Sequence, residues 1–134
     1  MATEEKLVEL LQSAQKIAVV GLSDKPWRAS NGVSRYMQQA GYQIIPVNPA
    51  AREVLGQPAF QRLEDVPYDV DVVNVFRRSE HVAELVDGAI ARRAKLFWMQ
   101  VGIRDESAKA RLEAAGVAVV MDRCLMIEHR RLLG

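Results

Sequence analysis

Candidate phosphate-binding residues gather in one stretch of the sequence, between a short apolar run and a patterned helix. The stretch covers residues 21–32 and combines glycines with hydroxyl, amide and cationic side chains, namely Gly21, Ser23, Lys25, Arg28, Ser30, Asn31 and Gly32. Glycine lets the backbone approach a bulky anion, and the unpaired N–H groups at a helix N-terminus attract negative charge. The stretch is therefore predicted to bind a phosphate or pyrophosphate.

The spacing of these glycines departs from the dinucleotide-binding fingerprint. A longer loop, with Gly21 and Gly32 at its ends, replaces the tight G-x-G-x-x-G motif. An ordinary strand-to-helix turn with solvated Lys25 and Arg28 is therefore the alternative interpretation. Phosphate binding is favoured because ligands of open parallel sheets bind at the loops beyond the carboxyl ends of the strands.

A second candidate loop follows the next apolar run, which ends at Asn48 and Pro49. Enzymes that bind NAD usually place an acidic residue at this point to bond the ribose hydroxyls. This chain has no carboxylate there, and Lys25, Arg28 and Arg52 are the cations nearest to this rim in the predicted arrangement. A phosphorylated ribose, in NADP or coenzyme A, suits this rim better than NAD, although Asn48-Pro49 is also a common turn sequence.

Two further strand ends carry residues of interest. Val75, Phe76 and Arg77 close the third apolar run, where Phe76 could pack on an adenine or pantetheine segment and Arg77 could meet a phosphate. Gln100 and Gly102 follow the fourth run, after a tryptophan that we assign to the core. The competing interpretations are a core position for Phe76 and a solvated Arg78, and the two interpretations stand level for Arg77.

An alternation of strands and helices is needed to bring these loops together. Strands are predicted over 16–21, 42–49, 71–76, 95–99 and 117–120, and helices over 4–14, from a Ser30 cap to residue 40, from a Ser79 cap to residue 90, over 106–115, and in a short charged tail after Asp122. Residues 52–65 are predicted to form a loop without core residues and with one helical turn near 62–65. This pattern predicts a single α/β domain over residues 1–134, with a Rossmann-like three-layer αβα fold and a five-stranded parallel sheet of order 3-2-1-4-5.

Composition narrows the range of partners. The chain has 134 residues, is 49% hydrophobic and 26% charged, and carries a formal net charge of +1, which favours a packed globular core over disorder. The balanced charge gives no general reason to expect nucleic acid or an anionic membrane as partner. A lone cysteine, the absence of a leader-like N-terminus and the lack of a long apolar run predict a cytoplasmic protein.

Catalytic candidates are few in this sequence. His81 and His129 are predicted to be surface residues, and Cys124 a structural cysteine, the alternative being a thiol whose pKa is lowered by Arg123. We find no cluster with metal-ligand spacing and no familiar nucleophile motif. The sequence therefore names no catalytic residue and no metal site, and it supports binding better than catalysis.

Five segments together resemble a known family. They are Ala18–Ser23 with Arg28 and Ser30, Pro46–Pro49, Val75–Ser79, Trp98–Gly102 and Met121–Cys124. In order and placement the chain resembles small single-domain CoA-binding proteins, which are similar to the N-terminal domain of the succinyl-CoA synthetase α subunit and to acyl-CoA synthetases. The resemblance implies coenzyme A as ligand. The larger synthetases also need a domain with a phosphorylatable histidine, which these residues do not match, so their reaction is not expected here.

The resemblance also implies a role for each segment. The loop residues Gly21, Leu22, Ser23, Lys25, Arg28 and Ser30 would hold the phosphates. Asn48 and Pro49 would border the adenosine, Val75, Phe76 and Arg77 would line the middle of the ligand, and Gln100 and Gly102 would lie near the pantetheine.

Three functions remain open at this point. The favoured one is a binding protein for coenzyme A or an acyl-CoA that acts as a carrier, sensor or partner subunit. The others are an NAD(P)-binding oxidoreductase or redox sensor, and an interaction protein with a vestigial nucleotide pocket. All three leave room for a protein partner or a homodimer.

Overall fold

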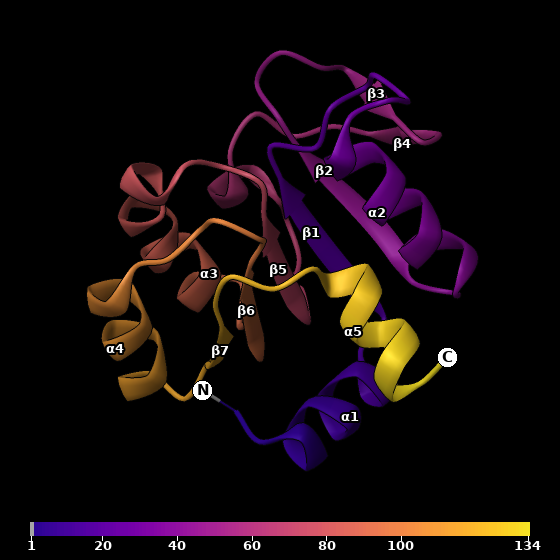
Figure 1. The fold of residues 1–134 in the computed structure, drawn as a ribbon. Coiled ribbons are helices and arrows are strands. Elements are labelled where there is room, and N and C mark those ends of the chain that lie inside the picture. Colours follow the sequence, from indigo (N-terminus) through magenta and orange to yellow (C-terminus); the bar gives the residue numbers. More distant parts are fainter. Residues whose placement is uncertain (1) are drawn as a thin grey trace.

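A parallel sheet of five strands forms the centre of the protein in a computed structural model that describes residues 2–134 (Figure 1). Every strand pairing in this sheet is parallel. Nearly all strand residues are buried, because both faces of the sheet are covered. The strands stand in the order β2 (Gln43–Val47), β1 (Lys16–Val20), β5 (Val72–Val75), β6 (Leu96–Met99) and β7 (Ala118–Val120).

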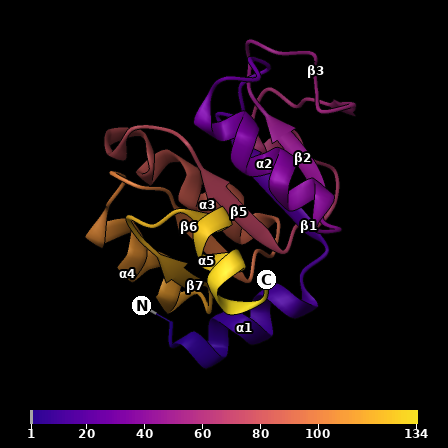
Figure 2. The same cartoon turned by 45° about the vertical axis from the view of Figure 1, so that its right-hand side comes forward.

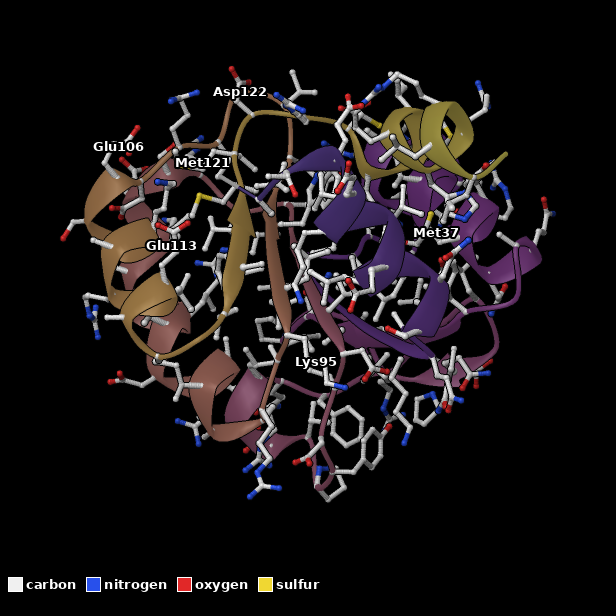
Figure 3. The ribbon with its side chains drawn as sticks, turned by 90° about the horizontal axis from the view of Figure 1, so that it is seen from below. Met37, Lys95, Glu106, Glu113, Met121 and Asp122 are labelled. Atoms are coloured by element: carbon white, nitrogen blue, oxygen red, sulfur yellow. The ribbon has the colours of Figure 1, made fainter. Side chains whose placement is uncertain are left out.

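Helices on both faces complete a three-layer arrangement (Figure 2). One apolar cluster joins the sheet to α1 (Glu4–Ser13), α2 (Ala29–Gln39) and α5 (Leu125–Leu132). The other joins it to α3 (Val86–Ala91) and α4 (Glu106–Ala114). Met37 and Met121 belong to the two different clusters and lie on opposite sides of the sheet (Figure 3). The predicted Rossmann-like α/β fold class is confirmed.

The predicted strand order, 3-2-1-4-5, is wrong. The third strand of the sheet, β5, pairs with β1 instead of lying outside β2. Pro46 lies within β2 and has no N–H for another strand, which suits an edge position. The outer edge is instead closed by Phe60, whose N–H donates to the Pro46 carbonyl at 3.0 Å and whose carbonyl accepts from the Asn48 N–H at 2.8 Å. The strand order therefore reverses between β1 and β5, and a crevice is expected at the carboxyl ends of these two strands.

Residues 52–65 contain more structure than the sequence indicates. They form a small antiparallel pair, β3 (Glu53–Val54) and β4 (Gln57–Pro58), followed by the 3-10 turn η1 (Leu63–Asp65), which confirms the predicted helical turn. The expectation of no core residues is wrong, because Val54 and Leu63 are buried. Isolated apolar residues show no periodicity, yet each of these packs into one of the two apolar clusters.

Two predicted serine caps serve other purposes. Helix α2 begins one residue before Ser30, and the Ser30 hydroxyl accepts the N–H of Ser23 at 3.0 Å. Ser79 begins a 3-10 turn, η2 (Ser79–His81), which is followed by η3 (Ala83–Leu85) and then α3, and its hydroxyl accepts the N–H of Arg104 at 2.9 Å. In both cases a serine that was predicted to cap a helix accepts a hydrogen bond from the backbone of a more distant residue instead.

The charged tail forms the predicted short helix, α5, and this helix is firmly attached. The indole N–H of Trp98 donates to the Arg123 carbonyl at 2.8 Å, and the Leu125 N–H donates to Oε1 of Gln100 at 2.9 Å. His129 is buried, so its predicted surface position is wrong. Its Nδ1 shares a 2.9 Å hydrogen bond with the Tyr36 hydroxyl, because α5 turns this side chain toward α2.

The Gly21 position generates a first prediction. Gly21 has φ +85°, and a Cβ added there would lie 2.8 Å from the carbonyl oxygen of Phe76. Gly56 has φ +77° but nothing within 4 Å of an added Cβ. Gly56→Ala should therefore cost about 1 kcal/mol of unfolding free energy for the left-handed backbone alone. Gly21→Ala should cost roughly 1–3 kcal/mol more, because backbone must also move. Urea unfolding of both variants measures this, and equal losses would contradict it.

His129 generates a second prediction. Burial lowers the pKa of this histidine below its ordinary value. In the unfolded chain the His129 imidazole therefore takes up a proton near pH ~6.5, whereas in the folded chain it does so only at lower pH. Stability is fully present above that pH and should fall as the pH drops toward the folded pKa, by at most about 1.4 kcal/mol per pH unit.

Chemical unfolding between pH 7.5 and 5 tests this, with His129→Asn as the comparison. Tyr36 and Tyr42 contact the imidazole from α2 and from the start of β2, and Arg130 stacks over Tyr36. Hydrogen bonding to Arg131 lowers the pKa of the neighbouring Glu128. The stability that this carboxylate contributes is therefore lost only in more acidic solutions. Identical pH profiles for the two proteins would refute the role of His129.

Candidate functional site

Three adjoining pockets lie along the carboxyl end of the sheet. The loop pocket, of about 420 Å³, is bounded by the segment from Gly21 to Ser30 and by Asn48 and Phe76. The β2-side pocket, of about 500 Å³, extends from Gly21 and Asn48 to η1 and Arg77. The α5-side pocket, of about 520 Å³, lies between Phe76, Gln100 and the start of α5. The pockets meet at the predicted crevice, because Phe76 and Arg77 follow β5 and Gly21 follows β1.

The loop pocket owes its shape to hydrogen bonds that hold Ser23 from both sides. Its N–H donates to the Ser30 hydroxyl at 3.0 Å, and its carbonyl accepts from Nδ2 of Asn31 at 2.9 Å. The Ser23 hydroxyl in turn accepts the N–H of Lys25 at 3.0 Å. Ser30 and Asn31 are buried at the start of α2. The loop is therefore fixed in place next to a helix N-terminus, where an anion is favoured.

The cations around the loop pocket are not equivalent. Lys25 lies 3.8 Å from the Asp24 carboxylate, and both side chains are more than half exposed. Arg28 also lines the pocket, and it forms no ion pair within residues 2–134. Arg77 borders the two flanking pockets instead, with its guanidinium 3.5 Å from the Glu84 carboxylate. Arg28 is thus the side chain most available to meet an incoming anion.

Asn48 ties the end of β2 to the loop after β1. Its Nδ2 donates to the Leu22 carbonyl at 2.8 Å, and its Oδ1 accepts the Ala50 N–H at 2.9 Å. Pro49 lines the β2-side pocket next to it. The amide therefore fixes two strand ends relative to each other, a role that a carboxylate could not fill, because it has no proton to donate to the carbonyl.

The predicted residues divide into two groups. The structure brings Gly21, Ser23, Lys25, Arg28, Ser30, Asn48 and Phe76 together in the loop pocket, while Pro49 and Arg77 border the β2-side pocket, and Gln100 and Gly102 border the α5-side pocket. Leu22 and Val75 are different, because their side chains are fully buried in the two apolar clusters. Each leaves only its backbone near the strand ends.

Sequence reasoning missed several residues that line these pockets. Gln61–Glu64 reach the β2-side pocket from the segment that was expected to be a loop with one helical turn, and no periodic pattern marks them as pocket residues. Cys124 and Ile127 reach the α5-side pocket because the tail helix packs beside the sheet end. The Arg123 guanidinium lies 3.1 Å from the Glu128 carboxylate. Arg123 therefore has a carboxylate partner on α5.

No group of three or more His, Cys, Asp or Glu side chains in residues 2–134 is placed to hold a metal ion. No helix among them is both long and apolar enough to cross a membrane.

The fold and the pockets define a class: a Rossmann-like α/β protein with an anion-favouring loop at the point where its strand order reverses. Comparison with known families makes the assignment specific. The model of the CoA binding domain family matches residues 15–130, and the chain belongs to that family.

Relatives of known sequence or structure agree with this assignment. The chain is 43% identical over 127 residues to the uncharacterized protein YneT of Bacillus subtilis (strain 168), covering 95% of this chain and 94% of YneT. A hypothetical protein from Pyrococcus horikoshii OT3 has 39% identity and a TM-score of 0.94, covering 99% of this chain and 94% of that one. The dinucleotide-forming acetyl-coenzyme A synthetase 1 of Ca. Korarchaeum cryptofilum, in its apo form, has 26% identity and a TM-score of 0.72, covering 84% of this chain and 27% of the synthetase.

The double attachment of Ser23 generates a third prediction. Ser30→Ala removes the acceptor of the Ser23 N–H and should lower the unfolding free energy by about 1 kcal/mol. Ser34→Ala is the matched control on the same helix, because the buried Ser34 hydroxyl has no hydrogen-bond partner among residues 2–134. Its removal should cost nothing or stabilise the protein. Urea unfolding of the two variants decides this, and an unfolding free energy that Ser30→Ala leaves unchanged would show that the loop bond does not stabilise the protein.

Proposed function

We propose that this protein binds coenzyme A, or an acyl-CoA, across the three pockets and acts as a carrier, sensor or partner subunit in the cytoplasm. The observation that carries the proposal is the loop from Gly21 to Ser30, fixed at the N-terminus of α2 beside Arg28, which has no ion-pair partner in the described part of the chain. Membership of the CoA binding domain family supports coenzyme A as the ligand. The helix N-terminus and the positive charge at the loop would by themselves suit any pyrophosphate.

The proposed ligand runs across the sheet end in a definite direction. In open parallel sheets the nucleoside lies over the end of the second strand, and the rest of the ligand crosses the point where strand order reverses. The adenosine would accordingly lie near Asn48 and Pro49, with the pyrophosphate in the loop pocket. The pantetheine would pass Phe76 toward Gln100 and Gly102 in the α5-side pocket.

We propose binding without catalysis because three polar side chains at the site are already bonded to the backbone. Ser30 bonds the backbone of Ser23, Asn48 bonds that of Leu22, and Gln100 bonds that of Leu125. Groups engaged in this way fix the shape of a binding surface. General acid-base catalysis needs a group whose pKa lies near the working pH, and serine, asparagine and glutamine side chains do not titrate there.

A panel of ligands tests the proposal. Thermal unfolding of the full chain with millimolar CoA, acetyl-CoA, NAD, NADPH and ATP should show the largest stabilisation with the CoA compounds. A ligand at a hundredfold excess over its dissociation constant stabilises the folded state by ~2.7 kcal/mol, which is easily measured. Stronger stabilisation by NADPH would favour an oxidoreductase, and no response to any nucleotide would favour an interaction protein with a vestigial pocket.

An Arg28 variant tests which phosphate this residue contacts. Arg28→Ala should weaken CoA binding more than dephospho-CoA binding if the guanidinium meets the 3′-phosphate, and equally if it meets the pyrophosphate. Lys95→Ala is the control, since it removes the same charge at the opposite end of the sheet (Figure 3). Unchanged binding of both ligands by Arg28→Ala would remove this residue from the site.

A further inference from the structure

The α5-side pocket differs from the other two in the character of its walls. Apolar side chains from α2, the strand ends and α5 make up most of its lining, among them Val33, Phe76, Val101, Ile103, Cys124 and Ile127. The loop pocket, by contrast, is lined mainly by Ser, Asp, Lys, Arg and Asn side chains and by backbone. A pocket with apolar walls favours an apolar occupant, because burial removes hydrocarbon from water.

Two of these side chains are unusually exposed. Val101 is 66% exposed and Ile127 is 55% exposed, and they face the same pocket from the turn after β6 and from α5. In residues 2–134, only two other large apolar side chains are exposed, those of Trp27 and Ile90. Exposed apolar side chains that gather at a cavity mark a ligand or partner site more often than a bare surface.

The pocket is continuous with the proposed nucleotide site. It shares Ala29 and Phe76 with the loop pocket and Arg77 with the β2-side pocket. A ligand whose pyrophosphate lies in the loop pocket therefore extends directly into it once past Phe76. An extension of the same ligand fits this connection better than a separate protein partner does.

The charges and hydrogen-bonding groups at the pocket indicate what the extension is. Arg77 and Arg78 lie at its edge, but Glu84 is 3.5 Å from the first and Glu80 is 3.8 Å from the second. Both cations are thus already partnered. Gln100 uses Oε1 to accept the Leu125 N–H, and its Nε2 has no acceptor within residues 2–134. The pocket offers one free amide donor among apolar walls, which suits a carbonyl followed by hydrocarbon and gives no unpaired cation to a carboxylate.

We propose that the α5-side pocket binds the hydrocarbon chain of an acyl thioester, so that the preferred ligand is an apolar acyl-CoA. The proposal rests on the CoA-binding function proposed above and specifies its substrate class. Nε2 of Gln100 donates to a carbonyl of the pantetheine or the thioester. The acyl chain packs between Val101 and Ile127 and covers them from water.

Titration calorimetry with the full chain tests this substrate class. The series is CoA, acetyl-CoA, butyryl-CoA, hexanoyl-CoA and succinyl-CoA. The dissociation constant should fall roughly two- to fourfold for each methylene added from acetyl to hexanoyl, as expected for burial of hydrocarbon. Succinyl-CoA, whose chain ends in a carboxylate, should bind more weakly than butyryl-CoA.

A pair of variants locates the effect. Ile127→Asn replaces an exposed apolar side chain of the pocket with a neutral polar one and should remove most of the preference of hexanoyl-CoA over acetyl-CoA. Ile90→Asn is the matched control, since Ile90 is 37% exposed on α3 and lines none of the three pockets. It should leave the preference intact.

The outcomes separate the two proposals. Tight binding of CoA with no gain from chain length, or tighter binding of succinyl-CoA than of butyryl-CoA, overturns the acyl site and leaves CoA binding standing. The same loss of preference in both asparagine variants also overturns the assignment to this pocket. No binding of any CoA compound by the unmodified chain overturns the proposed function and, with it, the acyl site.

Discussion

The close approach of Gly21 to Phe76 is the constraint on which the rest of the site depends. It arises because β1 and β5 lie side by side in register, with Val20 opposite Val75, so that the chain leaves both strands at the same level. The Gly21 N–H donates to the Val47 carbonyl of β2, and the Phe76 N–H donates to the Val20 carbonyl of β1. Three strand ends are thereby joined at one point, and all three pockets open from it. A side chain at residue 21 would separate them.

The sequence was sufficient for much of the fold but not for the neighbours of each strand. Five apolar runs, each too short for a helix and each followed by turn residues, located the five strands to within a few residues. Strand order is a different kind of information, because the apolar residues of β5 fit any buried position in a parallel sheet. Pro46 was the available signal, since a strand that contains proline belongs at an edge.

The residues of the candidate site could also be predicted only in part. Loop residues such as Ser23 and Arg28 could be placed because they follow a strand and precede a helix. Leu22 and Val75 could not be separated from pocket residues, because the alternation of faces at a strand end depends on where the last paired residue falls. The residues that α5 and η1 contribute to the pockets come from distant parts of the chain, and only the packed fold brings them to the sheet end.

The pairing of β1 with β5 also has a consequence for how the protein folds. These neighbours are far apart in the chain: the Lys16 N–H at the start of β1 donates to the Asp71 carboxylate, 55 residues away. The loop between them must close before the crevice exists, and such long-range closure slows folding relative to local helix formation. The segment from β1 through β2 supplies most of the loop pocket, whereas Phe76 and Arg77, which link the three pockets, come only with β5. A ligand that contacts the Phe76 side of the crevice would therefore bind only chains that have completed this step, and its binding would report directly on the fully folded population.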